Sequence, residues 1–314
     1  MNKGTVLALL VVVLGGGYGL GKLVIVGVGL IGGSFALALK QADAATSIVG
    51  VGRGRANVDA ARRLGIVDRG YTLDEPWAGE IGTADLVMLA TPVGQMPQLF
   101  AAIAPALGPA TVVTDAGSTK QDVIAAARAH LGAGLARFVP GHPIAGTERS
   151  GAGAAFAALF RDRNVVLTPL AETDPGALAR VSACWARCGA VVRLLDAARH
   201  DEILAAVSHL PHVLAFALVA GLASRSDATD CFDYAGTGFR DFTRLAGGEP
   251  AMWRDVCLAN RTALRSELAS YRGQLERIDT LLAQGDGDAL LRLLERARTA
   301  RRRWLEPQGD EDHA

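Results

Sequence analysis

The chain has 314 residues, of which half are hydrophobic, and its 32 lysines and arginines balance 32 aspartates and glutamates. This length allows two domains, each with a core of its own, and the zero net charge gives no reason to expect a nucleic-acid partner. The cysteines form no metal-type C-x-x-C pair, so we interpret them as reduced, buried thiols of a cytoplasmic protein. They are Cys184, Cys188, Cys231 and Cys257.

The first segment, residues 1–21, is not predicted to belong to a folded domain. Lys3 precedes an apolar run over residues 5–14, a pattern that resembles a secretory signal but is too short for a membrane span. Residues 15–19 are rich in glycine, yet no helix-like sequence follows them. We treat residues 1–21 as an N-terminal extension of uncertain status and expect no stable membrane association.

A glycine loop follows the first predicted strand. Residues 23–26, after Lys22, are continuously apolar, as in a strand buried on both faces, and residues 34–39 are helix-like. Between them, the glycines are spaced as in a Rossmann-type turn that holds a pyrophosphate at a helix N-terminus. The predicted cofactor-binding residues here are Gly27, Gly29, Leu30, Ile31 and Gly32. Export would separate the protein from such a cofactor, which also favours a cytoplasmic location.

The second predicted strand, residues 47–51, ends at two arginines, Arg53 and Arg55. An NAD site usually has an acidic residue there for the ribose 2′-hydroxyl, whereas arginine suits a 2′-phosphate. Asp43 and Asp59 are not well placed for that role. We therefore expect NADP or dual use of NAD and NADP, with Arg53 at the cofactor, although such arginines are also common solvated residues.

The pattern continues as an α/β, doubly wound parallel sheet. Residues 85–90 and 111–115 read as strands, followed by helix-like runs over 95–104 and 120–130. Two further strands, 164–168 and 190–194, flank a helix over 175–187. Ligands of such sheets lie beyond the carboxyl ends of the strands. Residues expected to share one crevice with the glycine loop are Thr91, Pro92, Ser118 and His142.

His142 lies in a turn-rich run, residues 141–151, with the sequence GHPIAGTERSG. Pro143 restricts the backbone of the residue before it, so the imidazole should leave a strand end in a defined direction. That placement suits a general base. The alternative is a structural histidine bonded to a loop carbonyl.

After Asp196 the sequence becomes helical. Apolar residues recur at helical spacing over residues 203–222 and from Met252 to about Leu305. We expect a helical domain over 196–305 and a disordered tail over 306–314. Long apolar faces suggest a homodimer, with an ordinary internal bundle as the alternative.

Two clusters of polar residues in the helical region are candidates for ligand binding. His209 and His212 flank Pro211, and a helical turn beginning at that proline would favour an anion. No further ligand has useful spacing, so we expect no metal. Arg240 and Arg244 are candidates for bidentate carboxylate binding, or else they are solvated.

Taken in order, these motifs resemble the prephenate/arogenate (cyclohexadienyl) dehydrogenase family of tyrosine biosynthesis. The resemblance rests on the glycine loop, DAGSTK over residues 115–120, the histidine motif over 141–151, SHLPH over 208–212 and FRDFTR over 239–244. It implies a Rossmann domain over 22–195, a helical dimerisation domain over 196–305, and NAD(P)-dependent oxidative decarboxylation of prephenate or arogenate. We expect no preceding chorismate mutase segment and no regulatory domain after Trp304.

The resemblance also implies roles. His142 would accept the substrate's hydroxyl proton, Ser118 would hydrogen-bond the same oxygen and the imidazole, and Arg244 would pair with a carboxylate. His212 would contact the substrate, and His209 would be structural. Thr147, Glu148 and Arg240 complete the predicted substrate-binding residues, the first two at the pocket entrance.

Two other functions are compatible with part of the pattern. A reductase of the β-hydroxyacid or pyrroline-carboxylate type shares the plan but often relies on a lysine in the helical domain, and residues 195–314 contain none. A non-catalytic, NAD(P)-sensing dimer would need none of His142, Ser118 and Arg244.

Overall fold

The computed structural model describes residues 19–147 and 149–306. Most of the predicted N-terminal extension, Glu148, and the tail from residue 307 therefore lie outside the described residues. The described chain separates into two compact units, one up to Ala263 and one from Leu264 onward.

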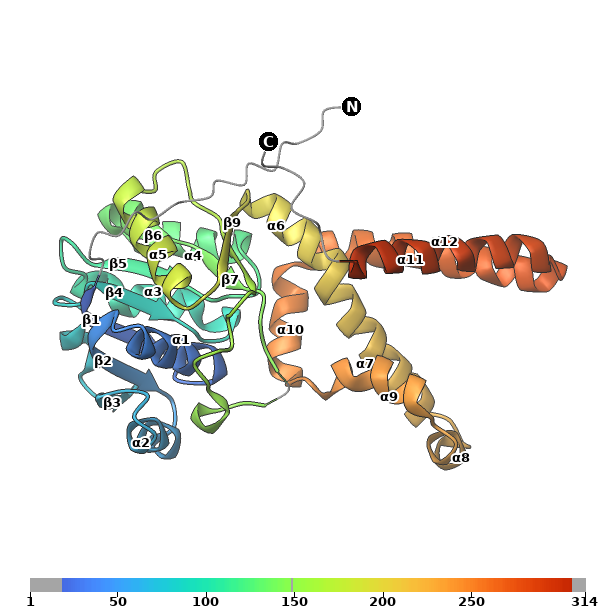
Figure 1. Ribbon diagram of the computed structural model, residues 1–314, viewed down its shortest axis with the longest axis horizontal. Helices are drawn as coiled ribbons and strands as arrows, with labels where there is room; N and C mark the ends of the chain where they lie inside the picture. The colour runs from blue at the N-terminus through green and yellow to red at the C-terminus, as the bar shows by residue number, and fades with distance from the viewer. Residues whose placement is uncertain (1–18, 148, 307–314) are drawn as a thin grey trace. The chain divides into compact units, whose positions relative to one another are not determined.

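Within the described residues, six strands form one parallel sheet in the order β3-β2-β1-β4-β5-β6 (Figure 1). The order reverses direction between β1 and β4, which is the switch point where doubly wound sheets bind ligands. The predicted α/β class is thus confirmed, and β1 begins at Leu20, inside the segment assigned to the extension. The strands are β1 (Leu20–Val26), β2 (Ala45–Gly52), β3 (Arg69–Thr72), β4 (Leu86–Leu89), β5 (Val112–Asp115) and β6 (Phe138–Val139).

Apolar residues on both sides of each strand give the sheet two cores. In β1, Leu23 and Ile25 face one cluster and Val24 faces the other, all fully buried. This explains why the strand sequences show no alternation of polar and apolar residues. The connecting helices are α1 (Leu30–Gln41), α2 (Arg55–Arg63), α3 (Met96–Ile103) and α4 (Gln121–His130), with 3-10 turns η1 (Trp77–Glu80), η2 (Val93–Gln95), η3 (Ala104–Ala106), η4 (Gly132–Arg137) and η5 (Ala152–Ala154).

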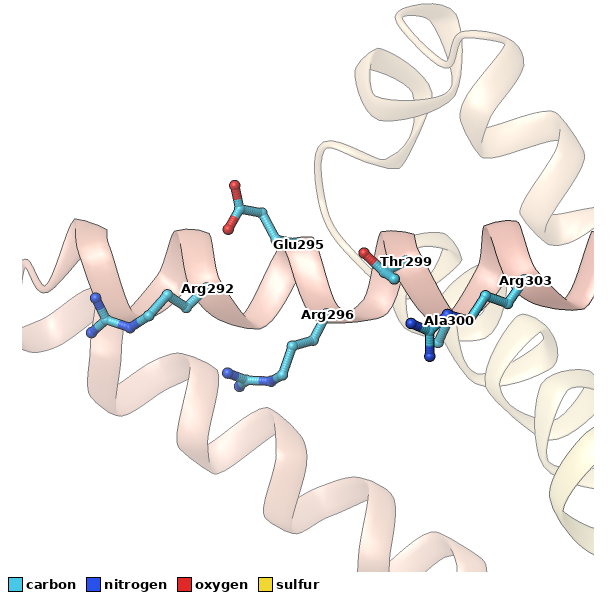
Figure 2. A pocket seen from close by; sticks show the side chains of 6 residues that line it. All are labelled: Arg292, Glu295, Arg296, Thr299, Ala300 and Arg303. Atoms are coloured by element: carbon cyan, nitrogen blue, oxygen red, sulfur yellow. The ribbon is translucent and has the colours of Figure 1, made fainter.

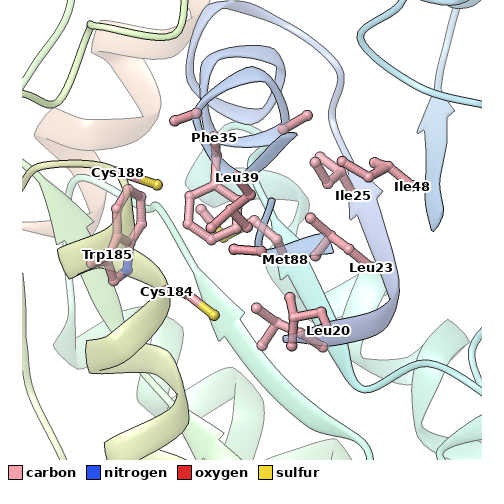
Figure 3. Packing of buried hydrophobic residues seen from close by; sticks show 14 of the residues in the cluster. Leu20, Leu23, Ile25, Phe35, Leu39, Ile48, Met88, Cys184, Trp185 and Cys188 are labelled. Atoms are coloured by element: carbon pink, nitrogen blue, oxygen red, sulfur yellow. The ribbon is translucent and has the colours of Figure 1, made fainter. Parts of the chain in front are cut away.

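The first core lies between α1 and α5 (Pro175–Arg187). Figure 3 shows Phe35 beside Trp185, and their ring centroids are 4.6 Å apart. Cys184 and Cys188 are buried in the same cluster, and burial raises the pKa of the Cys184 thiol to about 12. These two thiols are therefore packing residues. Cys231 and Cys257 are half-buried, rather than buried as predicted, and all four cysteines are free.

The later strands form a second sheet of their own. It comprises β7 (Gly141–Pro143), β8 (Asn164–Leu167) and β9 (Val191–Leu194), with β7 antiparallel to β8. His142 pairs with Val166 and so lies within a strand rather than beyond its end. The pairing fixes the backbone that carries the imidazole.

A long continuous helix begins after Asp196, whose side chain accepts hydrogen bonds from the Ala198 and Arg199 amides. Its parts are α6 (Ala197–Leu204), a π turn η6 (Ala205–His209) and α7 (Leu210–Ala223). Length and composition alone would let residues 197–223 cross a membrane, but one such helix is weak evidence, because core helices of soluble proteins pass the same test. The remaining helices of this unit are α8 (Ala228–Asp233), α9 (Thr237–Thr243), η7 (Arg244–Gly247) and α10 (Pro250–Ala259).

The second unit consists of most of α11 (Arg261–Gln284) and all of α12 (Gly287–Leu305). Gly285, at φ +66°, ends the first helix, and the Asp286 carboxylate caps the second by accepting from the Ala289 amide. Both helices keep large apolar side chains exposed to solvent. These are Leu275, Leu282, Leu291, Leu294, Trp304 and Leu305.

Candidate active site

The glycine loop connects β1 to α1, and two of its glycines are required by the chain itself. Gly27 has φ +102°, and a Cβ there would lie 2.3 Å from the Ala90 carbonyl oxygen. A Cβ at Gly32 would lie 2.2 Å from the Gly27 carbonyl oxygen. Any larger residue would displace backbone at both positions, so the turn depends on these two glycines.

Gly29 differs, because a Cβ there would meet no atom within 4 Å. It precedes α1, whose first turn has no acidic residue and no side-chain cap. The backbone amides of half-buried Leu30 and Ile31 thus begin a helix whose N-terminal dipole favours an anion. Open space above these amides fits a pyrophosphate.

The end of β4 supplies a further polar group beside this loop. The Thr91 methyl group lies 3.0 Å from the Cβ position at Gly27, and the Thr91 hydroxyl oxygen is buried without a hydrogen-bond partner among the described residues. Pro92, half-buried, begins the turn into η2. A buried hydroxyl of this kind is available to a bound cofactor.

The two arginines after β2 have different surroundings. Arg55 pairs with Glu75 and, at 4.0 Å, with Asp59, so its charge is largely compensated. Arg53 is exposed, and no ion pair involves it within the described part of the chain. Of the two, Arg53 is therefore the one whose charge remains for a ligand.

A buried ion pair ties the end of β5 to the strand that carries His142. Asp115 and Lys120, both fully buried, form this pair. The Lys120 ammonium also donates to the Gly141 carbonyl at 2.7 Å, and the Asp115 carboxylate accepts from the amides of Gly141 and Gly117 at 3.1 and 2.7 Å. The pair therefore fixes the residues that precede Ser118 and His142.

His142 is held at one nitrogen by a second histidine. Its Nδ1 lies 2.9 Å from Nε2 of His200, and Nδ1 of His200 lies 2.8 Å from a carboxylate oxygen of Asp201. Ser118 is half-buried, and the hydrogen bonds of the described residues do not include the predicted one between Ser118 and His142.

Burial and the nearby Lys120 ammonium keep the imidazoles of His142 and His200 neutral. Burial lowers the pKa of His142 well below its usual value, and His200, Lys120 and His209 lower it further. Burial also lowers the pKa of His200, although Asp201 opposes the shift. A neutral imidazole at ordinary pH can accept a proton, as a general base must.

The π turn and α7 supply the remaining histidines. His209 is buried, its Nδ1 lies 3.1 Å from the Asn260 side-chain amide, and burial lowers its pKa to about 4. His212 stacks on Trp253 with ring centroids 3.6 Å apart, and its Nδ1 donates to the Ser208 carbonyl at 2.9 Å. His212 therefore presents Nε2 as an acceptor.

Arg244 begins η7, and its charge lowers the pKa of His212, so these two predicted substrate-binding residues are neighbours. Arg240 is exposed on α9. Thr147 is also exposed, and its hydroxyl accepts from the Arg149 amide at 3.2 Å. Glu148 lies outside the described residues.

One prediction about this region is wrong. No helix begins at Pro211, because residues 197–223 form one continuous helix and the π turn before the proline accommodates its missing N–H. The amides expected to bind an anion are therefore occupied within the helix. Among the described residues, no group of three His, Cys, Asp or Glu could hold a metal ion.

His200 and Asp201 were not predicted from the sequence, and no role was predicted for Asp115 or Lys120. A lone His-Asp pair at the start of a helix carries no motif. The lysine that closes DAGSTK was a usable signal, since a charged side chain among buried strand ends needs a partner.

A surface groove elsewhere shares no residue with this cluster. It follows α12 in the second unit, and Figure 2 shows three arginines along it with one glutamate. Its lining consists of Arg292, Glu295, Arg296, Thr299, Ala300 and Arg303.

Comparison with known proteins identifies the family. Residues 35–194 match the model of the nucleotide-binding domain of prephenate dehydrogenase, and residues 196–296 match that of its dimerization domain. The chain is 37% identical over 279 residues to a cyclohexadienyl dehydrogenase of Zymomonas mobilis, covering 88% of this chain and 94% of that one. It is 32% identical to the prephenate dehydrogenase of Bacillus subtilis, covering 89% and 75%.

Similar solved structures support the same family. A prephenate dehydrogenase from Aquifex aeolicus, in complex with hydroxyphenyl propionate and NAD+, has a TM-score of 0.84 at 34% identity and covers 90% of this chain and 98% of its own. The arogenate dehydrogenase of Synechocystis has a TM-score of 0.75 at 30% identity, covering 90% and 100%. The chain belongs to the prephenate dehydrogenase family.

Proposed function

We propose that this protein is an NAD(P)-dependent dehydrogenase that oxidatively decarboxylates prephenate, or its amino counterpart arogenate, in tyrosine biosynthesis. One observation carries the proposal: His142, a neutral imidazole, directly follows Gly141, whose amide donates to Asp115 at the end of β5, in the same row of strand ends as the glycine loop. Family membership and the names of the relatives support the substrate class.

The chemistry needs a base beside a hydride acceptor. Prephenate carries a hydroxyl on ring carbon C4 and a carboxylate on C1. A bound nicotinamide would take hydride from C4, and loss of CO2 then makes the ring aromatic. His142 accepts the hydroxyl proton at Nε2, and the Ser118 hydroxyl donates a hydrogen bond to the same oxygen.

Residues from the helical region orient the substrate. Arg244 pairs with a substrate carboxylate, and the adjacent His212 accepts a hydrogen bond through its Nε2. Arg240 adds positive charge nearby in sequence, and Thr147 and Glu148 border the entrance. His209 is structural, because it is buried and bonded to Asn260.

Two features suit the site to a dinucleotide. There is open space at Gly29 for the phosphates, and the buried Thr91 hydroxyl is available for a hydrogen bond to the cofactor. Leu30 and Ile31 offer amides to the phosphates. Arg53 would face a ribose 2′-phosphate, which favours NADP or dual use. The relative solved with NAD+ supports NAD as one of the two cofactors.

We also propose a homodimer formed through the helical region. The match to a dimerization domain supports this assembly, as do the exposed leucines of α11 and α12, which water would otherwise contact. We place the enzyme in the cytoplasm, where its cofactor is available, with no nucleic-acid or membrane partner.

Steady-state kinetics test the function, with prephenate and arogenate each crossed with NAD+ and NADP+ and reduced cofactor followed by absorbance. We expect turnover of at least one cyclohexadienyl substrate, with NADP+ used at least as well as NAD+. Turnover of neither substrate by folded, cofactor-binding protein would overturn the proposal and favour a cofactor sensor.

A further inference from the structure

We propose that His200 and Asp201 are positioning residues that hold His142 in a single tautomer, with its proton on Nδ1 and a lone pair on Nε2. This role rests on the function proposed above, in which Nε2 of His142 takes the substrate's hydroxyl proton. The two contacts that carry it are the 2.9 Å and 2.8 Å bonds along the chain His142–His200–Asp201.

The direction of both hydrogen bonds follows from the carboxylate. Asp201 accepts from the backbone amides of Lys120 and Gln121 at 2.8 and 3.0 Å. Burial would raise the pKa of Asp201, but the hydrogen bonds from His200 and these amides lower it below its usual value, so the group is ionised. An ionised carboxylate only accepts hydrogen bonds, so Nδ1 of His200 must donate to it.

The tautomer of His142 follows in the same way. Neutral His200, with its proton on Nδ1, has a lone pair on Nε2. The nitrogen that meets this lone pair is Nδ1 of His142, so that nitrogen must carry the proton and Nε2 must be the acceptor. Without the carboxylate, the opposite arrangement of both protons would satisfy the imidazole pair equally well.

Other charges near the pair agree with this assignment. Lys120 lowers the pKa of both imidazoles, His209 lowers that of His142, and Asp115 and Asp201 raise that of His200. When His142 gains a proton during the reaction, its positive charge is therefore stabilised mainly through the hydrogen bond to His200, whose other nitrogen faces the carboxylate of Asp201. His200 and Asp201 are both buried, so water does not compete for these bonds.

Two amide substitutions separate the two nitrogens of His200. In His200→Gln, the side-chain oxygen can occupy the place of Nε2 and accept from His142, while the bond to Asp201 is lost. In His200→Asn, the side-chain amide can occupy the place of Nδ1 and keep the bond to Asp201, while the contact with His142 is lost. His130→Asn, on the exposed end of α4, serves as the matched control.

We expect His200→Asn to lower kcat about 10- to 100-fold with KM within about twofold, and His200→Gln to keep kcat within about threefold of the parent enzyme. A purely structural role predicts the reverse order, because the buried carboxylate loses its partner only in His200→Gln. Equal kcat values for the two variants, or the reverse order, would overturn the inference.

A second measurement does not depend on the substrate. The 15N chemical shifts of His142 report its tautomer in uniformly labelled enzyme, with the signals assigned by their loss in His142→Asn. We expect the Nδ1–H form in the parent enzyme and a shift toward Nε2–H in His200→Asn. If His142 of the parent enzyme carries its proton on Nε2, the positioning role is wrong. If the expected tautomer is found but neither substrate is turned over, only the proposed function is wrong.

Discussion

The two halves of the candidate site are held together by different means. The glycine loop spans six residues, Gly27 to Gly32, and depends on backbone geometry with no charged side chain. The histidine cluster consists of His142, His200 and Asp201 with the ion pair Asp115–Lys120, and it depends on buried polar side chains. His142 and its partner His200 are 58 positions apart in the sequence. The glycine loop is therefore a local property of the chain, whereas the histidine cluster forms only in the folded protein.

If the halves are separable, removing the base should leave cofactor binding intact. We expect His142→Asn to lower kcat about 10²- to 10⁴-fold, the usual value of a positioned base, with little change in the Kd of the cofactor. Steady-state kinetics and a fluorescence titration of the cofactor measure both. Full turnover would exclude His142 as the base, and lost cofactor binding would show that the halves are coupled.

The histidine cluster should also be the half on which folding stability depends. Lys120→Met leaves the Asp115 carboxylate buried without its counterion, so we expect the free energy of unfolding to fall by about 3–5 kcal/mol. Lys40→Met is the control, because its pair with Asp68 is at the surface and should be worth less than about 1 kcal/mol. Urea denaturation that gives equal losses for the two variants would contradict the contrast.

The same burial makes stability depend on pH. The pKa of His209 is about 4 in the folded protein, below the ordinary value near 6.5, so the unfolded chain binds more protons between these values. The stabilisation from neutral His209 is complete above about pH 6.5 and is lost as the pH falls toward 4. Its size is about 3 kcal/mol, and His142 and His200 act in the same direction.

Urea denaturation at several pH values between 7.5 and 4.5 measures this slope. We expect His209→Gln to flatten it, while His130→Gln at an exposed position leaves it unchanged. An undiminished slope in His209→Gln would mean that the unfolding transition does not report this imidazole.

The glycine loop should respond in the opposite way, through binding rather than folding. Gly29→Ala adds a methyl group where no protein atom lies within 4 Å, so we expect the free energy of unfolding to stay within about 0.5 kcal/mol. The methyl group would enter the phosphate space and raise the cofactor Kd about tenfold. Gly54→Ala, also in open space before a helix, is the control, and an unchanged Kd in Gly29→Ala would place the phosphates elsewhere.

This contrast also explains how much could be predicted from the sequence. The strand, the glycine turn and α1 follow from the spacing of residues 22–39, because each contact in the turn lies near in sequence or at the adjacent strand end. The end of β5 was predicted for the same reason. The position of His142 within a strand of a second sheet was not, because strand pairing depends on partners distant in sequence.

The partners of His142 could not be predicted. His200 lies in the run AARHDEIL at the start of a helix, which matches no motif, and only the folded chain brings it within 2.9 Å of His142. The predicted helix start at Pro211 was wrong for a related reason. Proline often occupies the first turn of a helix because it lacks an N–H, but here the preceding π turn accommodates the missing N–H within a continuous helix.

That π turn has a geometric consequence for the whole helix. In a regular α-helix, His200 and His209 would lie about 900° apart around the axis, which is roughly half a turn, so their rings would point in opposite directions. The wider turn over Ala205–His209 behaves as one inserted residue and removes about 100° of that rotation. Deleting one residue from this stretch would therefore give a regular α-helix in which His200 and His209 are eight positions and about 800° apart, so the two rings would keep the relative direction that the π turn gives them.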